Sequence, residues 1–357
     1  MRSQLRGRFY FCVLLMFLIA TSLLTSAQVT VFATGLNNPR GIKFGPDGFL
    51  YVAEGGLGGS RSTVGQCDQV IEPVGPYTGD FTARISKISP SGTRLTVAEH
   101  LPSSQTSPAL GSLISGVADV AFVGNTLYAL LAGAGCSHGL AGTTNGVIKV
   151  NSDRTWTLIA DLSAFQKAHP VKNPEPDDFE PDGTWYGMVT AKGLLYAVEP
   201  NHGEVDYVTT SGTITRVIDV SASQGHIVPS SITYRESLYV GNLNTFPVVP
   251  GSSNIFKITR VSGQISVFQP GVTTALGVAF DSQGRLYVLE TSTVPGNPTP
   301  GTGDVVRVKG DGTLETIASG LTFPTAMTFG ADGKLYVSNF GFGFPAGSGQ
   351  ILRIDVP

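Results

Sequence analysis

Short runs of alternating apolar and polar residues recur along the chain, and six of them contain leucine followed directly by tyrosine. The pattern is clearest in residues 324–339, where one run through Met327 and a second through Tyr336 flank the turn 331–333 (Ala-Asp-Gly). Two such runs joined by a tight Asp-Gly turn are typical of a β-hairpin. The pairs are Leu50-Tyr51, Leu127-Tyr128, Leu195-Tyr196, Leu238-Tyr239, Leu286-Tyr287 and Leu335-Tyr336.

The spacing of these pairs indicates a repeated unit. The last four tyrosines are 43, 48 and 49 residues apart, and we interpret the earlier gaps of 77 and 68 residues as the same unit carrying insertions. A second hairpin follows each first one, as at 305–308 and 314–318. Four antiparallel strands in a unit of ~40 to 50 residues describe a propeller blade. The sequence therefore predicts an all-β fold, a six-bladed β-propeller.

The two ends of the repeat array complement each other. The sixth unit has room for only three strands before the chain stops at Pro357. Residues 29–36 precede the first hairpin and match residues 314–321, the last strand of the fifth unit. We expect the N-terminal strand to pair with the C-terminal blade, which would close the ring and leave no open sheet edge.

The N-terminal segment differs from the repeats. Three arginines, an apolar run from Phe9 to Leu24 and a small-residue break predict a signal peptide over residues 1–27. A retained anchor is the alternative, because the apolar run approaches the ~18 residues at which a transmembrane helix becomes plausible. With cleavage, residues 28–357 would form a single propeller domain without a membrane span, in the periplasm or secreted, and we expect a monomer.

Composition narrows the choice of function. Only 14% of residues are charged, against a usual ~25%, and the net charge is −3. Because there is no basic stripe, nucleic-acid binding is not expected. Outside the N-terminal segment two cysteines remain, Cys67 and Cys136. In an exported protein such a pair predicts a disulfide, with two free thiols as the alternative.

The connections between predicted strands are unequal on the two faces of the ring. Turns after the first and third strand of each unit are short. The other connections carry nearly all insertions, at 55–83, 102–115, 132–145, 164–183, 241–253, 291–303 and 340–349. Long ordered loops on a rigid scaffold usually carry binding, so the elaborated face and its channel mouth are the expected site.

Four segments resemble the ScyD/ScyE family: 38–48, 180–187, 239–247 and 338–343. The resemblance runs over residues 29–355 and implies a bacterial, exported, six-bladed propeller related to NHL-repeat and TolB-like rings. The family has no established reaction, so it supplies no catalytic residue. The chain departs from the family at Thr184-Trp185, where members tend to have Asn-Pro.

Oxygen-bearing side chains stand three positions after five of the six tyrosines: Glu54, Glu199, Asn242, Glu290 and Asn339. Such hard ligands suit Ca²⁺ or Mg²⁺, and propellers resembling gluconolactonase hold a divalent cation with similar residues. The alternative is structural. Strand parity directs Glu54 between blades, where it would accept backbone N–H bonds from the loop that follows.

Other candidates lie near the predicted channel mouth. The residues expected there are Arg40, Asp119, Tyr186, Ser230 and Thr325. Arg40 and Asp119 would either form an ion pair with each other or bind a polar ligand. A second group lies in the loops. His202 follows Glu199 closely, as a general base would require, and Phe246 and Phe342 belong to two aromatic loops.

These features favour a ligand- or protein-binding scaffold with an apolar or aromatic ligand or a protein partner. The alternative is a divalent-metal-dependent lactonase or esterase-like hydrolase that uses the oxygen-bearing set. A quinone-dependent dehydrogenase resembles the fold only and lacks the expected histidine at the channel edge of the first blade. The chain has no Gly-x-Ser-x-Gly, His-Glu-x-x-His or Cys-x-x-Cys motif and no phosphate loop.

Overall fold

The computed structural model describes residues 27–174, 176–177 and 179–357. The predicted signal peptide lies outside the described residues except for Ala27. No helix in the described part of the chain is long and apolar enough to cross a bilayer.

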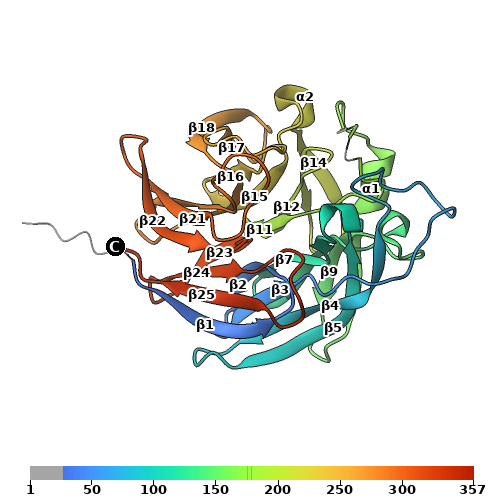
Figure 1. The fold of residues 1–357 in the computed structure, drawn as a ribbon, viewed down its shortest axis with the longest axis horizontal. Coiled ribbons are helices and arrows are strands. Elements are labelled where there is room, and N and C mark those ends of the chain that lie inside the picture. The colour runs from blue at the N-terminus through green and yellow to red at the C-terminus, as the bar shows by residue number, and fades with distance from the viewer. Residues whose placement is uncertain (1–26, 175, 178) are drawn as a thin grey trace, which may run out of the picture.

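The strands form six antiparallel sheets, which confirms the predicted six-bladed propeller (Figure 1). Blade 1 contains β2 (Pro39–Phe44), β3 (Leu50–Glu54), β4 (Thr78–Ile88), β5 (Arg94–Gln105) and β6 (Ile114–Ser115). Blade 2 contains β7 (Val117–Val123), β8 (Thr126–Leu131), β9 (Gly146–Val150) and β10 (Trp156–Asp161). Blade 3 contains β11 (Gly187–Ala191), β12 (Leu194–Glu199), β13 (Glu204–Val208) and β14 (Ile214–Asp219).

Blade 4 contains β15 (Pro229–Arg235), β16 (Ser237–Asn242), β17 (Ser253–Ile258) and β18 (Ile265–Val272). Blade 5 contains β19 (Ala275–Phe280), β20 (Leu286–Glu290), β21 (Gly303–Val308) and β22 (Leu314–Leu321). Blade 6 contains β23 (Ala326–Phe329), β24 (Leu335–Asn339), β25 (Gly349–Ile354) and β1 (Val29–Leu36). The described helices are α1 (Leu162–Ala168), α2 (Ser221–Gln224) and the short 3₁₀ turns η1 (Pro108–Leu110) and η2 (Cys136–His138).

Each leucine–tyrosine pair joins a blade to both of its neighbours. Successive side chains of a strand point to opposite faces of the sheet. The leucine therefore packs toward the preceding blade and the tyrosine toward the following one. Tyr51 shares a buried cluster with Leu127, and Tyr128 shares the next with Leu195. The pattern continues around the ring until Tyr336 of blade 6 meets Leu50 of blade 1. The core is thus six layers between blades, as the repeat predicts.

The predicted closure of the ring is confirmed. β1 pairs antiparallel with β25, and Val31 lies opposite Leu352. Figure 1 shows the two strands side by side. Leu36 at the end of β1 is fully buried in the cluster between blades 6 and 1. One difference from the prediction is the fifth strand β6 in blade 1, which adds to β5 from within the insertion expected to be a loop.

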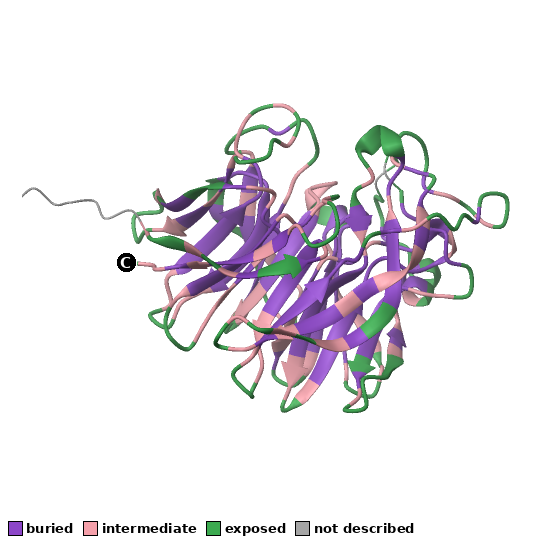
Figure 2. Ribbon diagram, turned by 60° about the horizontal axis from the view of Figure 1, so that its bottom comes forward, coloured by how far each residue is buried: buried purple, intermediate pink, exposed green. Residues whose placement is uncertain are grey.

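The uneven distribution of connections is also confirmed. The turns β2–β3 and β4–β5 are short, whereas β3–β4, β8–β9 and β20–β21 are long. In Figure 2 buried strands lie inside the blades and exposed residues gather in the loops and turns at the rims. Cys67 and Cys136, from the β3–β4 and β8–β9 connections, form the predicted disulfide. We call the face with the long connections the loop-rich face.

Candidate functional site

A cavity of about 570 Å³ lies at the channel mouth on the loop-rich face. The first strands of neighbouring blades contact one another around the ring and so line the channel. Arg40 of β2, Ser230 of β15 and Leu276 of β19 reach the cavity from this inner ring, and long loops complete the wall. Much of the wall is apolar: Val74, Leu110, Ile114, Leu243, Phe246 and Phe342. The volume of the cavity lies in the ~300 to 1,000 Å³ range of small-molecule sites.

Tyr186 forms the floor of this cavity. It precedes β11 in blade 3, and its hydroxyl donates to the backbone oxygen of Thr325 in the opposite blade 6, 3.2 Å away. Below it lies a small cavity of about 30 Å³ that Tyr186 also lines. Burial raises the pKa of Tyr186 to about 12, so the phenol is neutral and can keep donating this hydrogen bond. The ring therefore spans the channel and separates the mouth from the space beneath.

Two aromatic rings lie beside the guanidinium of Arg40 at this floor. The guanidinium carbon is 4.6 Å from the ring centroid of Tyr186 and 4.6 Å from that of Phe342. The one hydrogen bond of the guanidinium among the described residues goes from Nη1 to the Ile114 backbone oxygen at 3.5 Å. Arg40 is 5% exposed, and no described carboxylate forms an ion pair with it.

Asp119 lies deeper, beside the small cavity, and does not pair with Arg40. Its carboxylate accepts the backbone N–H of Val120 and that of Met188, each at 2.8 Å. Burial raises the pKa of Asp119. Since Met188 belongs to blade 3, the Asp119 side chain joins blades 2 and 3. Two roles were predicted for Arg40 and Asp119, an ion pair with each other or the binding of a polar ligand. Among the described residues, the structure shows no ion pair between them.

The five oxygen-bearing side chains bind backbone within their own blades. Glu54 accepts the N–H of Asn37 at 2.6 Å, and Glu199 accepts that of Thr184 at 2.9 Å. Asn339 accepts from Thr322 at 2.8 Å, Glu290 accepts from Thr273, and Asn242 donates to the Ile227 oxygen at 2.9 Å.

These five partners precede the first strand of the blade, so the expectation that Glu54 binds the following loop was wrong in direction. Glu199 and Asn242 also accept backbone N–H groups from residues after the second strand, His202 and Asn254. The antiparallel hairpin explains this, because the end of the second strand lies beside the start of the first. The five side chains remain in five different blades. Within the described residues, no group of three or more His, Cys, Asp or Glu is placed to hold a metal ion.

Two histidines of the loop-rich face, His138 and His202, are buried and hydrogen-bonded. His202 Nε2 lies 2.9 Å from the Glu180 backbone oxygen, and Glu199 accepts the backbone N–H of His202 at 2.6 Å. His138 lies 2.9 Å from the Ser104 hydroxyl, and burial lowers its pKa to about 4. His202 does not line the cavity. His138 and His202 therefore hold loops in place, whereas the half-buried His226 lines the cavity.

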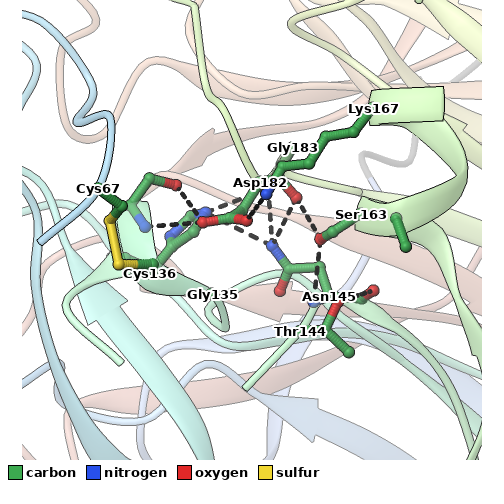
Figure 3. A network of polar contacts seen from close by, with 12 residues as sticks. Cys67, Gly135, Cys136, Thr144, Asn145, Ser163, Lys167, Asp182 and Gly183 are labelled. Atoms are coloured by element: carbon green, nitrogen blue, oxygen red, sulfur yellow. Dashed lines mark hydrogen bonds and ion pairs between the residues drawn. A yellow bond between two sulfur atoms is a disulfide. The ribbon is translucent and has the colours of Figure 1, made fainter. Parts of the chain in front are cut away.

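One polar network fixes the loops that form a side wall of the cavity (Figure 3). Asp182 accepts from the Ser137 backbone N–H at 2.7 Å and pairs with Lys167 of α1. Asn145 donates to the Gly183 oxygen at 2.7 Å. The Cys67–Cys136 disulfide lies beside the same network. These contacts join connections of blades 1, 2 and 3 into one wall.

The fold is shared with solved propellers. No family model and no curated protein sequence matches the chain. A gluconolactonase from Xanthomonas campestris superimposes with a TM-score of 0.55 at 12% identity, covering 93% of this chain and 90% of its own. A streptogramin B lyase gives 0.50 at 15% identity, with 93% and 98% covered. A putative oxidoreductase (glucose dehydrogenase) from Thermus thermophilus gives 0.56 at 16% identity, with 92% and 100% covered.

The structural neighbours are six-bladed propellers of the lactonase and lyase kind. Identities this low show the fold alone.

Of the eight candidates expected at the channel mouth and in the loops, five line the cavity: Arg40, Tyr186, Ser230, Phe246 and Phe342. Asp119 and Thr325 line the small cavity beneath, and His202 lines neither. Sequence reasoning did not single out the apolar residues of a blade 1 insertion. Leu110, Leu113 and Ile114 line the cavity from the insertion that contains η1 and β6. The sequence did contain a signal for this part of the site, namely three apolar residues within five positions of a predicted loop. Exposed loops are usually polar, so such a cluster indicates that the loop packs against something.

Proposed function

We propose that this protein is an exported propeller that binds a ligand through its loop-rich face rather than an enzyme. The observation that carries the proposal is the cavity of about 570 Å³ with its largely apolar and aromatic wall. Phe246 at the rim of the cavity is 52% exposed, so its ring is available to a ligand that enters. The five oxygen-bearing side chains, His138 and His202 are hydrogen-bonded to backbone and neighbouring side chains, which favours binding over acid–base chemistry by these groups.

The resemblance to the ScyD/ScyE family supports the same location. Arg40, Tyr186, Phe246 and Phe342 fall one in each of the four segments that carry the resemblance. Export is supported by the Cys67–Cys136 disulfide, since disulfides persist in oxidising compartments. The signal-peptide pattern of residues 1–27 also predicts export.

A metal-dependent lactonase is the alternative that the fold likeness to gluconolactonase supports. It would need the five oxygen-bearing side chains to leave their backbone partners, which is unfavourable for buried acceptors. Elemental analysis of the purified protein, with lactone hydrolysis measured before and after chelation, tests it. A bound divalent ion with chelator-sensitive turnover would favour the hydrolase and count against a pure binding role.

The binding proposal is tested with an uncharged fluorescent probe, N-phenyl-1-naphthylamine. We expect saturable binding to the wild type and a Kd raised about ten-fold or more by Phe246→Ala with Phe342→Ala, because two aromatic contacts are lost. Val261→Ala is the matched control: Val261 is 83% exposed and lies between β17 and β18, at a short turn. Unchanged binding in the double variant would refute the proposed site.

A further inference from the structure

Among the described residues, Arg40 is a buried cation without a buried counter-charge. Buried arginines are normally paired, because removing a charge from water is unfavourable unless an opposite charge replaces the solvent. Burial is the main influence on the pKa of Arg40, which it lowers. No described carboxylate contributes. The described protein therefore surrounds this guanidinium with aromatic rings and leaves its charge unmatched.

The surroundings of Arg40 determine how a ligand could reach it. The rings of Tyr186 and Phe342 each lie 4.6 Å from its guanidinium carbon and leave the N–H groups free to donate to a stronger acceptor. A guanidinium has five N–H donors, and the single long contact to Ile114 uses one of them. Because the N–H bonds lie in the plane of the guanidinium, an acceptor approaches in that plane, which is the geometry of a two-pronged contact with an oxyanion. Cation–π contact with the two rings positions the guanidinium before a ligand arrives.

The rest of the cavity indicates which anion is suitable. One unmatched positive charge balances one negative charge, and the neighbouring wall is apolar at Ile114, Leu276 and Phe342. Asp177 and Glu180 are the acidic residues of the wall, and Glu180 accepts a hydrogen bond from Tyr77 at 2.7 Å. A doubly charged phosphate would place its second charge near these acids and against apolar side chains. A monocarboxylate has no second charge to place there.

We propose that the cavity binds an organic monocarboxylate, with its carboxylate in the plane of Arg40 and its apolar body along Ile114 and Phe342 toward Phe246. This inference rests on the proposed binding function and specifies its ligand class. Arg40 is then the residue that selects an anion, and the aromatic and aliphatic wall supplies the affinity for the remainder of the molecule.

Three acid–amide pairs test the inference: 2-naphthoate with 2-naphthamide, biphenyl-4-carboxylate with its carboxamide, and octanoate with octanamide. Each amide keeps the shape of its acid and removes the charge. Binding is measured by isothermal titration calorimetry at pH 7 to the wild type, Arg40→Met and Phe246→Ala. We expect at least one acid to bind the wild type about ten-fold or more tightly than its amide, as for hydrogen bonds to a charged group.

Arg40→Met keeps an apolar side chain beside the two rings and removes the charge. It should abolish the preference for the acid and leave the amide within about three-fold, since the amide loses no ionic contact. Phe246→Ala should weaken acid and amide in parallel. Because Phe246 is 52% exposed, this change leaves folding intact. If Arg40→Met does not fold, as judged by circular dichroism, the comparison of acid with amide on the wild type decides the question.

One outcome would refute the monocarboxylate inference alone, and another would refute the proposed binding function as well. If the uncharged probe and the amides bind but the acids bind no better, or if Arg40→Met keeps the preference, the monocarboxylate inference is wrong and the binding cavity stands. If neither the uncharged probe nor any member of the three pairs binds saturably, the proposed binding function fails and the inference fails with it.

Discussion

Replacing Glu290 by glutamine should stabilise the protein at neutral and alkaline pH. Glu290 ends β20 directly opposite Asp304 of β21, and both carboxyls are largely buried. Burial, together with the hydrogen bond and charge of Asp304, raises the pKa of Glu290 to about 9, and burial also raises the pKa of Asp304. At pH 7 the folded protein therefore holds a proton between two carboxyl groups.

The size of the effect follows from proton linkage. The ordinary pKa of the glutamate is 4.5, so an unfolded chain has released this proton at pH 7 while the folded chain retains it. The stability linked to the proton is fully present below pH 4.5 and is lost as the pH rises toward 9. Each pH unit is worth about 1.4 kcal/mol, so over the roughly 2.5 units to pH 7 the loss reaches at most about 3 kcal/mol.

Glutamine preserves the uncharged state without needing a proton. Its amide oxygen can still accept the N–H of Thr273, as Glu290 does, and its amide nitrogen can donate to Asp304. The free energy of unfolding of Glu290→Gln should exceed that of the wild type by up to about 3 kcal/mol at pH 7, with the difference vanishing near pH 4.5. Urea unfolding from pH 5 to pH 9, followed by the fluorescence of the fully buried Trp185, measures this.

Glu54→Gln is the matched control, because Glu54 occupies the same position in blade 1 but faces Arg84. Its carboxylate lies 2.7 Å from Arg84 and 3.7 Å from Arg94. Removing that charge leaves two arginines without their partner, so this variant should be destabilised at pH 7, opposite in sign to Glu290→Gln. If Glu290→Gln is less stable than the wild type above pH 7, or if its advantage does not change with pH, the shared-proton argument is refuted.

Three further predictions concern the scaffold. Replacing Cys67 and Cys136 by serine should lower the free energy of unfolding in urea by about 4 kcal/mol, because a loop spanning 69 residues gains freedom in the unfolded chain; an unchanged midpoint would show that the polar network beside the disulfide suffices. Leu36→Ala should cost about 3 kcal/mol, because the fully buried side chain joins β1 to the closing blade; a cost below about 1 kcal/mol by the same assay would mean that closure does not limit stability. Asp119→Ala should cost about 2 kcal/mol in thermal or urea unfolding, since the buried N–H of Val120 loses its acceptor; Asp119→Asn, which keeps an acceptor oxygen, should recover part of the loss.

The scaffold could be predicted from the sequence because its determinants are local and repeated. Alternation with a period of two places the leucine and tyrosine of each pair on opposite faces of a strand, and six copies of that pair are enough to define six layers between blades. The match between residues 29–36 and 314–321 predicted the closing strand for the same reason. The disulfide followed from topology, since Cys67 and Cys136 occupy equivalent connections of neighbouring blades.

The site depended on contacts between residues far apart in the chain. The sequence placed Arg40 near the channel, but only the tertiary structure shows its charge lying close to the rings of Tyr186 and Phe342 without a described carboxylate beside it. The strand β6 and its apolar neighbours became part of the cavity because blade 1 folds its insertion over the channel mouth. Alternation decides which side of a strand a residue occupies. Which side chains from different blades meet over the channel, and which charges are left unpaired there, is decided by the closure of the ring and the packing of its loops.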